Sequence, residues 1–178
     1  MTNRGFKLKF APLTKTALLC AVSIVLSAIE NMIPQIPFLM PGMKLGLSNI
    51  AVVFALETVN LPCAVAVVIF KGLFALLTRG VTAGLMSFCG SLLSCLAMFF
   101  LLKIQKPRFG YIGVAVCGAF FHNFAQLLVS LALMGKAVFS YLFVLSLSSL
   151  VTGAITGVIV GAVMPSVNAV SMRETEAL

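Results

Sequence analysis

Residues 62–79, PCAVAVVIFKGLFALLTR, decide the fold class because they are almost wholly apolar and carry one lysine near the middle. As an α-helix this stretch is about 27 Å long, close to the roughly 30 Å hydrocarbon core of a bilayer. Similar apolar runs recur from residue 13 to residue 164. Helices satisfy their own backbone hydrogen bonds in lipid. We therefore predict an all-α, polytopic membrane protein.

The composition supports the same class. The 178 residues are 61% hydrophobic and only 9% charged, whereas soluble domains carry about 25% charged residues. Twelve Lys and Arg against four acidic residues give a net charge of +8. A soluble protein with this charge would suggest nucleic acid as a partner, but these basic residues gather at the ends of apolar runs, as the positive-inside rule requires. We expect a lipid bilayer around the chain and no nucleic acid.

Prolines, glycines and basic residues divide the chain into about six expected transmembrane helices. Their ranges are 13–32, 44–60, 62–79, 82–102, 110–134 and 138–164. The second and third are short for a bilayer, so one of them need not cross fully. The first follows a basic segment, as a signal peptide does, but it lacks a convincing cleavage site and is long enough to span, so we expect it to be retained.

We expect a single transmembrane domain, 1–178, with a basic N-terminal segment, 1–12, and a polar C-terminal tail, 165–178. If there are six spans, eight of the twelve basic residues fall on one side of the membrane. That side is predicted to be cytoplasmic, which gives an N-in and C-in topology.

The sequence lacks the residues that most enzymes use. It contains no aspartate and no GxxxxGK[ST] segment, so neither an Asp-rich magnesium–diphosphate site nor a phosphate-binding loop is predicted. One histidine and five cysteines without CxxC spacing do not suggest a zinc site. We predict no catalytic residue, no metal and no cofactor.

Polar side chains within the apolar helices point instead to ligand binding. Lys71 should lie near mid-membrane, where an ionised side chain is costly and usually faces a cavity or a partner. The segment HNFAQ, 122–126, places His122 and Gln126 on one helical face. Three cations oppose one carboxylate, so an anion with an apolar part is favoured. The predicted binding residues are Glu30, Lys44, Asn49, Lys71, Arg79, His122, Asn123 and Gln126.

Structural alternatives stand beside this prediction. Lys44 and Arg79 could extend to lipid headgroups, and the polar residues of HNFAQ could be hydrogen-bonding links between helices. Small residues also recur at helical spacing, as Ala17 and Ala21 and as Gly153, Gly157 and Gly161. Internal helix packing is the default for such strips. A docking face for another protein is the alternative.

Two segments carry a resemblance to a known family. PGMKLGLSN, 41–49, followed by HNFAQL, 122–127, resembles the heptaprenyl diphosphate synthase component I family, also called the Gx transporter family. Ser48 stands where that family suggests alanine, and Lys71 stands where it suggests arginine. Lysine keeps the charge but cannot make a bidentate contact.

That family is similar in turn to the substrate-binding S components of energy-coupling factor importers. Those six-helix proteins bind vitamins or related small molecules from outside. They dock, partly through an AxxxA strip on the first helix, to a shared transmembrane subunit and two ATPases. The resemblance thus implies a multi-pass protein of the bacterial cytoplasmic membrane, with Ala17 and Ala21 as docking residues. If the chain captures a ligand from outside, we expect the 33–43 loop to close as a lid.

Two functions follow as expectations. The first is an importer subunit that captures an anionic or amphipathic small molecule, vitamin-like or a prenyl (di)phosphate, and docks to a separate energising module. The alternative is a non-catalytic membrane subunit associated with polyprenyl diphosphate synthesis, whose catalyst would be a partner. A third hypothesis is a purely structural subunit of a membrane complex.

Overall fold

The computed structural model describes residues 2–32, 46–104 and 110–176, and these residues are helical almost throughout. Within those ranges there is no β-strand, so the all-α class is confirmed. The elements are α1 (Thr2–Met32), α2 (Asn49–Thr58), α3 (Leu61–Arg79), α4 (Val81–Ile104), α5 (Gly110–Met134), the 3-10 helix η1 (Lys136–Tyr141) and α6 (Leu142–Glu176).

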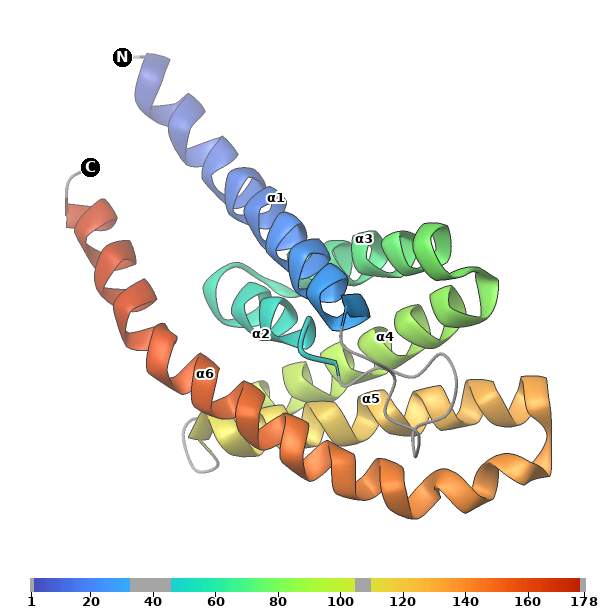
Figure 1. The fold of residues 1–178 in the computed structure, drawn as a ribbon. Helices are drawn as coiled ribbons and strands as arrows, with labels where there is room; N and C mark the ends of the chain where they lie inside the picture. The colour runs from blue at the N-terminus through green and yellow to red at the C-terminus, as the bar shows by residue number, and fades with distance from the viewer. Residues whose placement is uncertain (1, 33–45, 105–109, 177–178) are drawn as a thin grey trace.

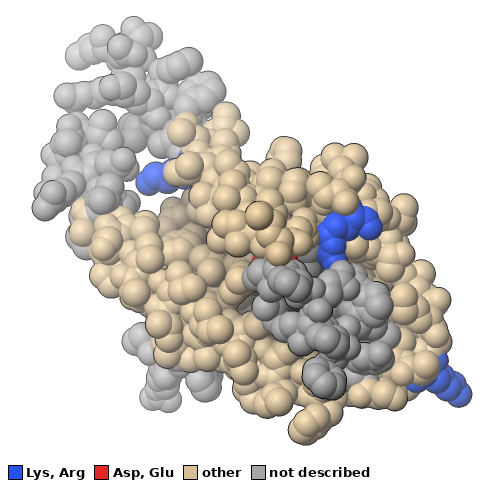
Figure 2. All heavy atoms as spheres, in the orientation of Figure 1, with Lys and Arg blue, Asp and Glu red and all other residues tan. Residues whose placement is uncertain are grey.

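Five of the described helices are long and apolar enough to cross a membrane. The candidate spans are Pro12–Met32, Leu61–Arg79, Val81–Ile104, Gly110–Met134 and Phe143–Val167. This finding makes the chain a polytopic helical membrane protein. Large apolar side chains such as Leu77 and Phe143 are exposed. On the face drawn in Figure 2, the described surface consists almost entirely of uncharged residues, with Lys and Arg at a few separate places.

The expected second span, 44–60, requires a correction. Helix α2 has 10 residues, which is about 15 Å and roughly half of a hydrocarbon core. Gly46 precedes it at φ +85°, a left-handed conformation that an α-helix cannot contain. At its other end Asn60 caps α3 by accepting a hydrogen bond from the Cys63 amide at 3.0 Å. These two turns leave α2 too short to cross.

Helix α2 lies inside the bundle, in contact with α1, α3, α4, α5 and α6. Its residues Ala51, Val52 and Ala55 have no exposed surface. Figure 1 places both chain termini at one end of the bundle, and the α3–α4 turn and the α5–η1–α6 connection at the opposite end. Termini on one side agree with the predicted topology, whose N-in orientation stays a prediction.

The glycine strip of α6 packs against α5. A Cβ atom on Gly153 would lie 2.5 Å from Val116 Cα, and one on Gly157 would lie 2.4 Å from Ile112 Cα. Both distances are far shorter than a real contact, so the two backbones touch only because these residues are glycines. The internal-packing interpretation is therefore confirmed for Gly153 and Gly157.

The alanine strip of α1 behaves differently. Ala17 and Ala21 are both exposed, beside Leu18 and Val22. The opposite face of α1 carries the buried residues Thr16, Cys20, Ser23, Ser27 and Glu30. Internal packing is therefore wrong for this strip within the described bundle, and Ala17 and Ala21 face lipid or another protein.

We predict that Gly157→Ala lowers the free energy of unfolding by about 1–3 kcal/mol, because an added methyl group forces α5 and α6 apart. Gly161→Ala is the matched control, since its Cβ would meet Tyr111 at an ordinary 3.8 Å. Thermal unfolding of both variants in the same detergent measures the effect. Equal stability of the two variants would contradict the tight α5–α6 contact.

Candidate functional site

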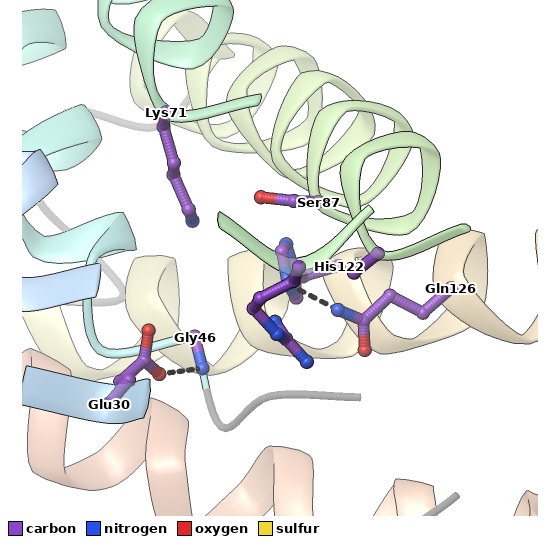
Figure 3. A pocket seen from close by; sticks show the side chains of 8 residues that line it. Glu30, Gly46, Lys71, Ser87, His122 and Gln126 are labelled. Atoms are coloured by element: carbon purple, nitrogen blue, oxygen red, sulfur yellow. Dashed lines mark hydrogen bonds between the residues drawn. The ribbon is translucent and has the colours of Figure 1, made fainter. Parts of the chain in front are cut away.

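A small cavity opens between α1, α3, α4 and α5, in the half of the bundle away from the chain termini. Figure 3 shows it from close by. Its lining residues are Glu30, Gly46, Lys71, Arg79, Ala83, Ser87, His122 and Gln126. Five of the eight predicted binding residues therefore line one cavity, and they come from three helices. The space has room for about one water molecule.

Glu30 joins the end of α1 to the turn that leads into α2. One of its carboxylate oxygens, Oε1, accepts hydrogen bonds from the backbone N–H groups of Gly46 at 2.6 Å and Leu47 at 2.7 Å. The Ser48 hydroxyl donates to its Oε2 at 3.2 Å. Amide groups at the start of a helix lack intrahelical acceptors and favour negative charge. Glu30 thus supplies the anion that the start of α2 requires.

Lys71 brings a buried cation to the cavity. Its side chain is 2% exposed, and its Nζ donates a hydrogen bond to Asn49 Oδ1 at 2.6 Å. The Ser91 hydroxyl donates to the same oxygen at 3.4 Å. An ammonium group within a membrane protein is costly unless polar groups surround it. Asn49, the first residue of α2, therefore orients the Lys71 side chain. The sequence predicts that Asn49 binds the ligand, and here it contributes to the site through Lys71.

Arg79 adds a second positive charge. It is half-buried at the end of α3, lines the same cavity, and its charge interacts with that of Glu30. The described lining thus contains two cations and one carboxylate. This balance leaves a net positive charge, which favours an anionic ligand.

His122 and Gln126 form a pair one helical turn apart on α5. Gln126 Nε2 lies 3.1 Å from His122 Nε2, as Figure 3 shows. The Gln126 side chain is 2% exposed, yet its Oε1 has no hydrogen-bond partner among the described residues. Leaving such a group unpaired is costly. A buried amide oxygen of this kind is typical of a site that a water molecule or a ligand completes.

Asn123 lies outside the cavity. Its Nδ2 donates to the Leu145 carbonyl at 3.2 Å and to the hydroxyls of Ser148 at 3.2 Å and Ser149 at 2.9 Å. It therefore links α5 to α6, as the alternative interpretation of a hydrogen-bonding link predicts. Lys44 and the 33–43 loop lie outside the described residues.

No pattern in the sequence marks the remaining lining residues. Ala83 and Ser87 on α4 resemble many other small residues of an apolar helix. Gly46 stands within PGMKLGLSN, but its role as a backbone donor depends on its turn rather than on its side chain. Gly90, also on α4, admits His122, because a Cβ there would lie 2.8 Å from the imidazole Cε1.

Comparison with known proteins identifies the family. Residues 19–163 match the family described as heptaprenyl diphosphate synthase component I, so the chain belongs to that family. The resemblance found in PGMKLGLSN and HNFAQL is thereby confirmed at the level of this family. No curated protein and no solved structure matches the chain significantly.

We predict that Gly90→Ala displaces the His122 ring and disturbs its contact with Gln126. His122 is the single histidine of the sequence, so its imidazole NMR signals are unambiguous. Those signals should shift in Gly90→Ala and should stay in place in Gly161→Ala, whose added Cβ would meet only Tyr111. Unchanged imidazole signals in Gly90→Ala would contradict the close Gly90–His122 contact.

Proposed function

We propose that this member of the heptaprenyl diphosphate synthase component I family is a membrane-embedded binding subunit. It captures a compact anion in the cavity beside Lys71. The buried Lys71 ammonium is the observation that carries the proposal. A lysine buried inside the bundle and lining a polar cavity brings a positive charge that attracts an anion. Packing alone gives no reason for it.

The cavity residues have different roles in binding the anion. Lys71 and Arg79 attract the negative group, and Asn49 fixes the direction of the Lys71 side chain. Gln126 offers its Oε1, which has no hydrogen-bond partner among the described residues. Opening the cavity for a ligand larger than water requires the lining side chains to move apart. No step of this role breaks or forms a covalent bond, so the subunit binds rather than catalyses.

A second small cavity suggests where an apolar part of the ligand would lie. It shares Gly46 with the first cavity, and Asn49 also lines it. Its further lining residues are Val53, Ser94, Met98, Ala115, Gly118, Ala119, Thr152 and Thr156. Small and apolar groups predominate there, which suits a short hydrocarbon portion.

We further propose that this subunit serves the import of its ligand into the cell. The cavity lies toward the end of the bundle opposite the termini, which the charge distribution predicts to face outward. The exposed strip of Ala17 and Ala21 would receive the transmembrane subunit of an energising module with ATPases. Small residues permit the close helix approach that such docking needs.

The family description favours one other function, a non-catalytic membrane subunit associated with polyprenyl diphosphate synthesis. In that role Lys71 and Arg79 would bind the diphosphate of a prenyl compound. The apolar outer surface of the bundle would contact the prenyl hydrocarbon chain. Because the sequence contains no aspartate for a magnesium–diphosphate site, a partner would carry out the elongation.

We predict that Lys71→Ala weakens binding of the anion at least tenfold, which corresponds to about 1.4 kcal/mol or more. Lys136→Ala is the matched control, because Lys136 is exposed and lies outside the cavity. The ligand is first extracted from the purified protein and identified by mass spectrometry, and its affinity is then measured by calorimetry. Equal affinity in Lys71→Ala and the wild type would rule out this cavity as the site.

Co-purification separates the two functions. If the subunit serves an importer, mild detergent should retain a transmembrane subunit and ATPases on the wild type. Ala17→Leu with Ala21→Leu should release them, since larger side chains block close helix approach. Gly157→Ala, which forces α5 and α6 apart without touching α1, serves as the control for general damage to the bundle. Retention of a prenyl synthase in place of ATPases would favour the second function.

A further inference from the structure

The carboxylate of Glu30 occupies the place in the cavity that best suits an anion. The N–H groups of Gly46 and Leu47 both point at its Oε1, at 2.6 Å and 2.7 Å. They lie just before α2, whose positive dipole end favours negative charge. Ser48 donates to the other oxygen. Two backbone N–H groups and one hydroxyl just before α2 are thus directed to a single side chain of α1.

This arrangement excludes a simpler role for Glu30. A binding carboxylate would present a free oxygen to a cationic part of the ligand. Here Oε1 already accepts two backbone hydrogen bonds and Oε2 accepts one from a hydroxyl, and the Glu30 side chain is 7% exposed. The carboxylate therefore already accepts three hydrogen bonds from the turn that leads into α2.

We propose that Glu30 is an internal substitute for the ligand, and that the incoming anion takes the N–H groups of Gly46 and Leu47 from it. The proposal rests on the anion-binding function proposed above and adds two backbone donors to that site. Arg79 lines the same cavity and interacts electrostatically with Glu30. Its guanidinium would keep the displaced carboxylate paired within the cavity.

Gln126 supplies an independent sign of a ligand in this cavity. Its amide is buried and lines the same space as Glu30 and Gly46, and its Oε1 lacks a partner among the described residues. In Figure 3 the oxygen points away from His122. As drawn, it can accept from a hydroxyl of the ligand, as in a hydrogenphosphate. With the amide turned by 180° it would donate to an anionic oxygen.

The exchange would link binding to the junction of two helices. While Glu30 holds Gly46 and Leu47, the end of α1 is fixed to the start of α2. A ligand that replaces the carboxylate removes this connection between the end of α1 and the start of α2. Since α1 carries the exposed Ala17 and Ala21, the occupied and empty states would differ in the helix proposed to meet a partner.

The test compares Glu30→Gln with Glu57→Gln in the full chain in detergent. Glutamine retains the shape and one acceptor oxygen at position 30 but removes the competing charge. Glu57 lies on α2, is exposed and is outside the cavity, so its variant makes the same change in net charge. Inorganic phosphate, inorganic diphosphate and acetate are titrated by calorimetry. We expect the best of them to bind about tenfold more tightly to Glu30→Gln than to the wild type, and equally to Glu57→Gln and the wild type.

Hydrogen exchange provides the second measurement. Glu30→Ala should speed exchange of the Gly46 and Leu47 amides, and saturating anion should restore their protection. Equal or weaker binding by Glu30→Gln, or no restored protection, overturns the exchange proposal. If Lys71→Ala still lowers affinity in that case, the binding function stands without it. Absence of binding to the wild type and to Glu30→Gln with all three anions overturns both.

Discussion

The hydrogen bond between Lys71 Nζ and Asn49 Oδ1, at 2.6 Å, is the contact on which the rest of this structure depends. An ammonium group so deep in an apolar bundle needs an acceptor within reach. The acceptor is the first residue of α2, so α2 must begin inside the bundle rather than at its surface. The buried start of α2 in turn exposes amide groups that require an anion, and Glu30 of α1 provides it. The buried charge of Lys71 thus accounts for the buried start of α2 and for the carboxylate of Glu30 beside it.

Close helix packing makes this arrangement possible. Apolar side chains gain little by leaving lipid for protein, so helices in a membrane associate through tight contact and interhelical hydrogen bonds. Both occur here: Gly153 and Gly157 bring α6 onto α5, and Asn123 bonds to three acceptors of α6. The Asn123 bonds also fix the rotation of α5. His122 and Gln126 are thereby directed to a neighbouring face of α5, which lines the cavity.

The sequence predicted the features that depend on a single helix. Apolar length identified the spans, and the four-residue spacing of His122 and Gln126 placed them together. Of the features that depend on contacts between helices it predicted only part, such as the gathering of Glu30, Lys71 and His122 at one cavity. The bond from Gly46 to Glu30 joins a backbone N–H to a side chain 16 positions away and leaves no pattern in the sequence. The outward direction of Ala17 and the α6-facing direction of Asn123 depend likewise on which neighbour each helix meets.

The charges of the described cavity bear on the choice between the two proposed functions. Lys71 and Arg79 against Glu30 leave one net positive charge, which a single carboxylate neutralises. A diphosphate carries at least two negative charges, so its binding beside an ionised Glu30 would place like charges together at low dielectric, where repulsion is strong. Asn49 and Ser91 are neutral and add no cation. The described lining therefore matches a monoanion better than a prenyl diphosphate, which favours capture of a small carboxylate over a role in binding prenyl substrates.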